Sequence, residues 1–463
     1  MNKPLSLAAC TLACLAFSAC SNDADTTGAD PARPNVLLIV VDTLRADHLG
    51  AYGNERPTSP NLDALAASGV RYGQALSTAP WTTPSIAALM TSRYPSSVGI
   101  ESEKARLSDE ALLLAEVLQE AGYLTGAAVS HSFCGSEWGF GQGFDGFDES
   151  NVLGHAAVTT DGVTARGMSF LDEAAEQDQP WMLWLHYFDP HCAYVEDERH
   201  PMGGRGDYDG KVQSGELYRK VLRQWRRYDE SDWNEMRRLY DSEIARTDQG
   251  IGELLAHLDR LGLTDNTLVV MTADHGEEFH EHGGVGHAKT LYREVLHVPL
   301  IVRYPRSDAR FAAAQPAAPE GWVSLVDVAP TVLDVCQLEQ PQPFVGLSLL
   351  RERRTDRPHY VFGETHRAGG LRTVVADDFK LIRWLDPRRT NLFDLSADPE
   401  ESKDLSRNPL HKARLGSMNA ALDAHLERVT LSALKAVPIE LDAEAEERLG
   451  DMGYAGSDED DED

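Results

Sequence analysis

Two aspartates and a histidine stand at the ends of apolar runs of strand length. Asp42 directly follows residues 35–41, and Asp274 and His275 come just after residues 268–272. Continuous apolar runs of this length are typical of strands covered on both faces of a parallel sheet, and such sheets place their chemistry beyond the carboxyl ends of the strands. Because carboxylate oxygens and imidazole nitrogens suit a hard or borderline divalent cation, these strand ends predict a metal site.

Two threonines stand where a short helix is expected to begin. Thr82 and Thr83 precede Pro84, a residue suited to a first helical turn, and residues 85–92 are rich in Ala, Leu and Met. The backbone N–H groups and the dipole at a helix N-terminus favour an anion. A hydroxyl there is either a helix cap or a nucleophile, and this stretch by itself favours the cap.

A glycine-rich stretch, residues 280–289, carries a third set of polar side chains. His287 and Lys289 lie at its end, and a mobile loop with imidazole and ammonium groups suits an anion. The alternative interpretation is a surface loop with spare histidines. The Asp-Pro-His sequence at residues 189–191 follows another apolar run, residues 181–188, and adds His191 to the candidates.

The order of the elements indicates an α/β fold. Strand-like and helical patterns alternate through residue 350, which predicts a parallel sheet with helices on both faces. Further strands are expected at residues 125–129 and 298–302, and helices at residues 60–68, 110–121 and 242–261. Residues 193–241 are interpreted as a polar insertion whose basic helix is either a solvated face or a substrate lid.

The chain changes character after residue 358. Short strands at residues 360–364, 371–376, 380–384 and 391–395, followed by a helix at residues 412–429, predict a smaller α+β unit with an antiparallel sheet.

The termini predict a targeting segment and a tail. Residues 1–20 are interpreted as a lipoprotein-type signal in which Cys20 becomes the lipidated first residue; the alternative is secretion with cleavage near Ala19. Residues 21–34 are expected to form a polar tether, and residues 457–463 are expected to form an acidic, disordered tail.

Net charge and cysteine spacing exclude some partners and sites. The formal net charge of −31 argues against a nucleic-acid partner. Three cysteines lie beyond the signal, at positions 134, 192 and 336. Their scattered spacing predicts neither a metal site nor a disulfide framework, so each is expected to be a small buried side chain.

Several of these stretches together resemble the sulfatase family of the alkaline phosphatase superfamily. They are residues 35–50, 81–85, 189–191, 272–277, 289–299 and 372–405. The resemblance extends from residue 35 to about residue 456. It implies an alkaline-phosphatase-like, mostly parallel sheet sandwiched by helices, with a catalytic domain over residues 35–355 and a smaller C-terminal α+β subdomain over residues 356–456.

The resemblance also implies a role for each polar position. Asp42 and Asp274 match metal ligands, and Thr82 matches the nucleophile of the Cys-x-Pro-Ser-Arg signature. Lys289 matches a lysine that contacts the sulfate group. His191 matches a histidine near the ester oxygen of the substrate.

The sequence departs from the family pattern at this site. Sulfatases oxidise the signature Cys or Ser to formylglycine, and Thr82 cannot yield that aldehyde because it carries a methyl group on Cβ. Ile86 replaces the signature Arg, Thr43 replaces a second Asp, and His275 replaces the usual Asn. The Lys and His of a Gly-Lys-x-His stretch appear as Ser130 and Ser132, with His131 between them.

The combination of Asp42, Thr82, Asp274 and His275 resembles a second branch of the superfamily. Phosphodiesterases, phosphoethanolamine transferases and lipoteichoic acid synthases use a Thr nucleophile beside Zn²⁺ or Mn²⁺. We therefore expect these four residues to hold one divalent ion, which is Ca²⁺ if the site is sulfatase-like and Zn²⁺ or Mn²⁺ if it is phosphodiesterase-like. A second ion bound by His287 with Asp189 or His191 stays open.

The expected reaction is hydrolysis of an ester through a covalent intermediate on Thr82, which water then resolves. His191, His287 and Lys289 are expected to hold the non-bridging oxygens or to protonate the leaving group. The alternatives are a phosphodiesterase, a transferase of phosphorylated headgroups, or an inactive sulfatase fold that serves as a binding protein.

The expected substrate is a sulfate or phosphate ester of a small molecule or glycan. The expected location is the bacterial cell envelope, as a periplasmic or outer-membrane lipoprotein, or outside the cell after secretion. Membrane contact is expected only through the N-terminal lipid anchor.

Overall fold

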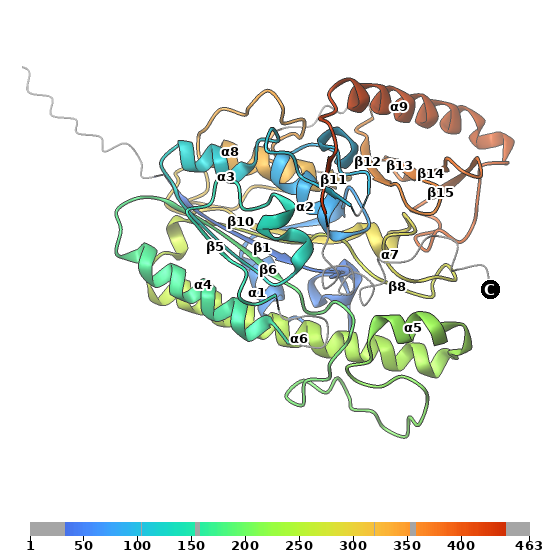
Figure 1. The fold of residues 1–463 in the computed structure, drawn as a ribbon, viewed down its shortest axis with the longest axis horizontal. Coiled ribbons are helices and arrows are strands. Elements are labelled where there is room, and N and C mark those ends of the chain that lie inside the picture. The colour runs from blue at the N-terminus through green and yellow to red at the C-terminus, as the bar shows by residue number, and fades with distance from the viewer. Residues whose placement is uncertain (1–32, 103, 153–157, 319, 352–357, 441–463) are drawn as a thin grey trace, which may run out of the picture. The chain divides into compact units, whose positions relative to one another are not determined.

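A central, mostly parallel sheet positions the polar residues of interest. The computed structural model describes residues 33–102, 104–152, 158–318, 320–351 and 358–440, all within one compact unit. Within these ranges the sheet has eight strands. In spatial order they are β11 (Val323–Ser324), β2 (Val70–Leu76), β10 (His297–Arg303), β7 (Thr267–Ala273), β1 (Asn35–Val41), β6 (Trp181–Tyr187), β4 (Leu124–Val129) and β5 (Gly146–Asp148) (Figure 1). The predicted signal, the tether up to residue 32 and the acidic tail lie outside the described residues.

The register of the central strands brings the predicted metal ligands to one edge. Strand β1 lies between β6 and β7, is parallel to both, and is buried along its whole length. Val41 pairs with Ala273, so Asp42 and Asp274 leave the sheet side by side. Strand β10 runs antiparallel to β7 and to β2, and it is the one reversed strand of this sheet in the described chain.

Helices cover both faces of the sheet, as expected. Helices α1 (Pro60–Ser68), α4 (Thr160–Ala175) and α6 (Glu230–Arg260) pack together on one face. On the other face lie α2 (Thr82–Thr91), α3 (Leu114–Glu120) and α8 (Val328–Val335) (Figure 1). The three cysteines predicted to be buried are buried, and within the described residues none of them forms a disulfide.

Two helix boundaries correct the expectations from sequence. Helix α3 begins at Leu114 rather than at residue 110, because the Glu116 side chain accepts a hydrogen bond from the Leu113 N–H and sets the first turn there. Helix α6 begins at Glu230 rather than at residue 242. Asp229 caps it by accepting hydrogen bonds from two N–H groups, so the irregular part of the insertion ends at this residue.

The insertion itself contains one short helix. This helix, α5 (Tyr218–Gln224), is followed by a single 3₁₀ turn at Trp225–Arg227. The first residue, Tyr218, is buried, whereas the basic residues of the 3₁₀ turn, Arg226 and Arg227, are exposed.

A second sheet forms from the C-terminal part of the chain, as predicted. In the described residues it has four antiparallel strands: β12 (Val361–Thr365), β13 (Leu371–Ala376), β14 (Phe379–Trp384) and β15 (Arg389–Asp394). Helix α9 (Lys412–Leu431) packs on β13 and β14 (Figure 1).

The remaining short elements are α7 (Arg293–Leu296), the pair β8 (Glu278–Phe279) and β9 (Val285–Gly286), and the pair β3 (Ala105–Arg106) and β16 (Val437–Pro438). Across the described residues, no helix is both long enough and apolar enough to cross a bilayer.

Candidate active site

Three buried side chains form a cluster that could hold a metal ion. Asp42, His186 and Asp274 each offer one donor atom, and these atoms all lie within 4.8 Å of one another. They come from three adjacent strands: Asp42 follows β1, Asp274 follows β7, and His186 is the next-to-last residue of β6. The sequence prediction included both aspartates but missed His186.

Several polar atoms of this cluster have no hydrogen-bond partner in the described structure, and their chemistry suits a cation. Within the described chain, both carboxylate oxygens of Asp42, Oδ2 of Asp274 and both ring nitrogens of His186 have no hydrogen-bond partner in good geometry. Burial raises the pKa of Asp42 well above its usual range, and the nearby carboxylates of Asp274 and Glu277 raise it further. Burial lowers the pKa of His186 to about 4, so its ring is neutral at pH 7 and has a lone pair to offer. A divalent ion would compensate the crowded carboxylates and satisfy these atoms.

His275 lies beside the same two aspartates. Its Nε2 is 3.6 Å from Oδ1 of Asp42 and 3.5 Å from Oδ2 of Asp274. Its Nδ1 lies 2.9 Å from the carbonyl oxygen of Gly276. A carbonyl oxygen can only accept, so Nδ1 carries a proton, and Nε2 is the nitrogen with a lone pair in the neutral ring.

Thr82 lies against this histidine. Its Oγ1 is 3.4 Å from Nε2 of His275, and the whole residue is buried. Helix α2 begins at Thr82, three residues earlier than predicted, and its N-cap residue is Trp81, which makes no side-chain cap. The cap interpretation of Thr82 is therefore wrong. Thr83 instead donates its hydroxyl hydrogen bond to the carbonyl oxygen of Phe133, 3.0 Å away.

Two further predicted histidines belong to the same group of rings. The ring centroid of His287 lies 4.5 Å from that of His275 and 5.1 Å from that of His191. His287 and His191 are both buried. Lys289 follows His287 by two residues and is half-buried. The backbone N–H of Ala288 donates to the carbonyl oxygen of Pro80, which holds this loop against the start of α2.

The Asp189 carboxylate is hydrogen-bonded to the first residue of a helix. Its Oδ2 accepts hydrogen bonds from the N–H (2.8 Å) and the hydroxyl (2.6 Å) of Thr160, the first residue of α4. Among the described residues, the one group that meets the geometric criterion for a metal site is that of Asp42, His186 and Asp274. The second ion stays a prediction.

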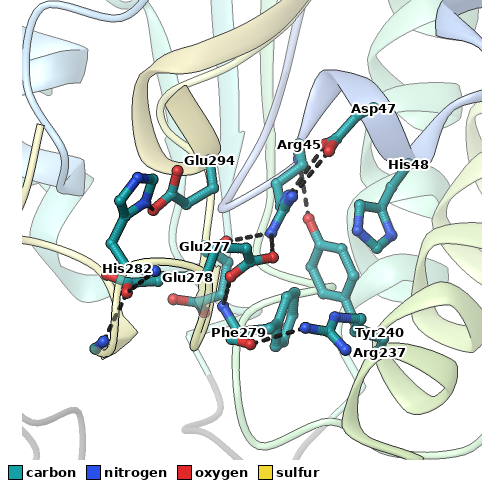
Figure 2. Close-up of polar contacts among 12 residues, drawn as sticks. Arg45, Asp47, His48, Arg237, Tyr240, Glu277, Glu278, Phe279, His282 and Glu294 are labelled. Atoms are coloured by element: carbon teal, nitrogen blue, oxygen red, sulfur yellow. Dashed lines mark hydrogen bonds and ion pairs between the residues drawn. The ribbon is translucent and has the colours of Figure 1, made fainter. Parts of the chain in front are cut away.

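A buried arginine fixes the loop that follows β7. The Arg45 guanidinium donates to the Glu277 carbonyl oxygen (3.0 Å) and to the Glu281 carboxylate (2.6 Å), and it pairs with Asp47. Figure 2 shows Arg45 between Asp47 and the Glu277 segment, with the Tyr240 hydroxyl at the Arg45 backbone. This hydroxyl also donates to the carbonyl oxygen of Thr43. The segments that carry Asp42 and Asp274 are thus held to each other and to α6.

Sequence reasoning missed three residues of this site: His131, His186 and Glu277. His131 lies between the two serines that replace the family's Lys and His, and its ring lies 6.3 Å from that of His186 and 5.7 Å from that of His191. The available signal for His186 was a histidine near the end of an otherwise apolar strand. For Glu277 it was an acidic residue three positions after Asp274.

Comparison with known proteins identifies the family. A family model described as sulfatase matches residues 34–338, and a second, described as the C-terminal part of N-sulphoglucosamine sulphohydrolase, matches residues 281–429. An N-acetylglucosamine-6-O-sulfatase of Bacteroides thetaiotaomicron is 23% identical, with 85% of this chain and 86% of that protein covered. A choline-sulfatase of Rhizobium meliloti is 26% identical, with 83% and 84% covered.

Solved structures share the fold. One, determined in complex with its substrate D-glucosamine-2-N,6-O-disulfate, matches with a TM-score of 0.71 at 20% identity, covering 86% of this chain and 98% of the other. A phosphonate monoester hydrolase from Silicibacter pomeroyi matches with a TM-score of 0.69 at 21% identity, covering 86% and 96%. The family model covers well over half of the chain, and the sheet, the second antiparallel sheet and the buried polar cluster agree with it. The chain therefore belongs to the sulfatase family, of the alkaline phosphatase superfamily, and is a hydrolase that acts on ester bonds.

Proposed function

We propose that this protein is a metal-dependent hydrolase of sulfate esters carried by a glycan or small molecule, and that Thr82 is its nucleophile. The observation that carries the proposal is the contact of the buried Thr82 hydroxyl with His275, beside the cluster of Asp42, His186 and Asp274. The relatives named as sulfatases, and the fold neighbour solved with a sulfated glucosamine, support the substrate class.

The residues around Thr82 suit an attack on a sulfate or phosphate group. A divalent ion bound by Asp42, His186 and Asp274, with Thr82 and His275 adjacent, would acidify the threonine hydroxyl and offset the charge of the ester oxygens. Thr82 is the first residue of α2, and the first N–H groups of a helix have no intrahelical partner. Such N–H groups could stabilise the negative charge that develops on an ester bound at Thr82.

A phosphodiester or phosphonate ester is the second candidate substrate. Thr82 cannot become formylglycine, which favours a chemistry that uses the hydroxyl directly. One fold neighbour is named a phosphonate monoester hydrolase, and one relative, 24% identical, is named a multifunctional alkaline phosphatase superfamily protein. A headgroup transferase and an inactive binding protein remain the less favoured proposals.

A paired substrate screen tests the proposal. Purified protein is stripped of metal, reloaded with Ca²⁺, Zn²⁺ or Mn²⁺, and assayed on an aryl sulfate, a phosphate monoester and a phosphodiester. We expect turnover of the sulfate with at least one ion. Turnover of the phosphodiester alone would favour the second candidate substrate. No turnover of any ester with any ion would refute both candidate activities.

Substitutions at Thr82 test the nucleophile in the same assay. Thr82→Ala should abolish turnover while the protein still binds its ion, and Thr82→Ser should retain activity because it keeps the hydroxyl. Equal turnover by wild type and Thr82→Ala would exclude the nucleophile assignment.

We also propose that the protein is anchored in the bacterial envelope through a lipid on Cys20. The support is the sequence of residues 1–20, which lie outside the described part of the chain. Fractionation of cells that express wild type or Cys20→Ala tests it: the wild type should partition with membranes and the variant should not. Identical partitioning of the two would refute it.

A further inference from the structure

The short helix of the insertion separates its basic from its apolar side chains. Helix α5 and the 3₁₀ turn after it carry aromatic and aliphatic residues at positions i, i+3, i+4 and i+7, which are Tyr218, Val221, Leu222 and Trp225. The other positions include no acidic residue and five basic ones, which are Arg219, Lys220, Arg223, Arg226 and Arg227. This spacing puts the two kinds of side chain on opposite sides of a helix. We call the five basic residues the basic face of the insertion.

The apolar side of this helix is fixed inside the protein. Tyr218 and Val221 are buried, and Leu222 and Trp225 pack against the hydrophobic core. All five residues of the basic face are exposed. A basic amphipathic helix that lies in a membrane needs its apolar side to enter the lipid. Because that side is occupied here, the helix can recognise a partner only through charge and hydrogen bonds.

Tyr218 joins this helix to the loop of the candidate active site. Its hydroxyl donates to the carbonyl oxygen of Val285, 3.2 Å away, and its ring stacks on the His287 ring with 6.3 Å between the centroids. The His287 ring is held in turn, because its Nδ1 lies 2.9 Å from Oε1 of the buried Glu277. The basic face therefore begins one residue after a side chain that lies beside the site.

The far end of the helix lies against the start of the same loop. The ring centroid of Trp225 is 5.6 Å from that of His280, and the Arg226 guanidinium lies over the Trp225 ring at 5.0 Å. Figure 1 shows α5 between β8 and the first turns of α6. From Arg219 to Arg227 a helix rises roughly 12 Å. A surface of this length can contact charged groups beyond the ester itself.

Most charges of the basic face are open to a ligand. Within the described residues, Lys220 pairs with Glu216 at 2.6 Å, whereas Arg223 and Arg227 form neither an ion pair nor a side-chain hydrogen bond. The next acidic residue along the chain, Asp229, is engaged in capping α6. The whole chain has a formal net charge of −31, so the basic face is a local exception. An anionic polymer would be repelled by most of the protein and attracted to this face.

From these observations we propose that the basic face binds an anionic glycan chain, and that the ester cleaved at Thr82 is carried by such a chain. This inference rests on the proposed function and narrows its substrate class from a glycan or small molecule to a polyanionic glycan. The guanidinium fork suits the oxygens of carboxylate, sulfate and phosphate groups. Charged sugar units beside the reacting unit contact the basic face while the ester lies at Thr82.

Removal of three charges tests this surface by direct binding. The full-length Thr82→Ala protein, which should bind without turnover, is titrated with labelled dextran sulfate as the polyanionic probe and with neutral dextran as the blank. The test variant adds Arg223→Gln, Arg226→Gln and Arg227→Gln. An exposed ion pair changes an equilibrium constant by about two- to threefold, so we expect Kd for dextran sulfate to rise roughly tenfold. At about 1 M ionic strength, where the Debye length is about 3 Å, the two Kd values should converge.

A second triple variant controls for the change in total charge. Arg407→Gln, Lys412→Gln and Lys435→Gln remove the same charge from exposed residues of the C-terminal part of the chain. They should leave Kd for dextran sulfate within about twofold of the parent value. With Thr82 intact, both triple variants should turn over a small aryl sulfate with the kcat and KM of the wild type, because none of the six side chains belongs to the candidate active site.

The outcomes distinguish this inference from the proposed function. A higher Kd for dextran sulfate in the basic-face variant alone, with unchanged turnover of the aryl sulfate, supports it. Equal Kd values in the two triple variants, or no binding of dextran sulfate by the parent protein, would overturn it. Binding to phosphatidylglycerol vesicles that depends on the three arginines, with no such dependence for dextran sulfate, would overturn it in favour of a membrane partner. No turnover of any ester would refute the proposed function, while the Kd comparison still decides whether the basic face binds a polyanion.

Discussion

The metal site can be tested through His186, because its replacement should affect the protein in opposite directions with and without an ion. Neither ring nitrogen of His186 has a hydrogen-bond partner in the described structure, and the residue is buried between β1 and β4. A buried polar group without a partner costs about 1–3 kcal/mol. In the metal-free protein, His186→Leu should therefore leave the free energy of unfolding unchanged or raise it within that range.

With the ion present the sign reverses. At a free ion concentration 100 times Kd, binding adds about 2.7 kcal/mol to the stability of the wild type. Loss of outer partners of metal ligands typically weakens affinity 10- to 100-fold, and we expect the loss of a ligand to reach about 100-fold. The same ion concentration then equals Kd for the variant, and the gain shrinks to about 0.4 kcal/mol.

Urea unfolding with and without Zn²⁺, Mn²⁺ or Ca²⁺ measures both quantities. His297→Leu is the matched control, since His297 is also buried, on β10, and burial also lowers its pKa to about 4. The control should lose stability in both conditions, because its Nε2 bonds the Gly73 carbonyl oxygen, and should keep the full gain from the ion. A full gain of about 2.7 kcal/mol in His186→Leu would refute the metal site as described.

Three other predictions concern residues around the site and the second sheet. Arg45→Gln should lower the free energy of unfolding by about 1–3 kcal/mol and weaken ion binding, because Glu281 loses a partner 2.6 Å away but stays 21% exposed to water. Unchanged urea unfolding and unchanged ion affinity would contradict the role of Arg45 in holding these segments together. Lys380→Met should lower the free energy of unfolding by about 3–5 kcal/mol, because it leaves the buried carboxylate of Glu401 without its ion-pair partner. Adding Glu401→Gln should recover most of this loss. A double variant as unstable as the single one would disprove the pairing. Burial lowers the pKa of His425 from 6.5 to about 3, so the unfolded chain binds more protons between these values, and stability should fall by up to about 1.4 kcal/mol per unit as pH decreases below 6.5. His425→Phe should flatten this slope in urea unfolding measured across that range, and an identical slope would count against it.

The sequence was sufficient to predict the sheet and the two aspartates at its edge. Strand β1 matches its predicted bounds, 35–41, because an uninterrupted apolar run has one stable place, the middle of a covered parallel sheet. Asp42 and Asp274 then follow from the strand ends alone. The second sheet was also predictable, since strands β12 to β15 alternate with short turns and need only local pairing.

His186 was not predictable in the same way. An apolar run identifies a buried strand, but it does not tell which strands lie beside it or in which register. Only the pairing of His186 with Val40 and Val129 places its ring near Asp42. The Glu277 and His287 pair likewise depends on how two irregular loops fold back on each other, and no periodic pattern encodes that.

The start of α6 was missed for another reason. Residues 230–241 are rich in charged side chains, so they appear as a polar insertion when the sequence is considered alone. In the structure several of these charges are buried and paired, such as Arg238 with Glu235. The cap at Asp229 was the available local signal for the true start of the helix.

The central claim is that Thr82 becomes covalently esterified during turnover, and one measurement tests it most directly. The metal-loaded enzyme is mixed with its best ester, quenched in acid within the first turnovers, digested, and the peptide that contains Thr82 is sequenced by mass spectrometry. The account predicts a sulfo or phospho group on Thr82, absent from Thr82→Ala and from enzyme quenched without substrate. A modified residue other than Thr82, or full turnover by Thr82→Ala with no modified peptide, would contradict it.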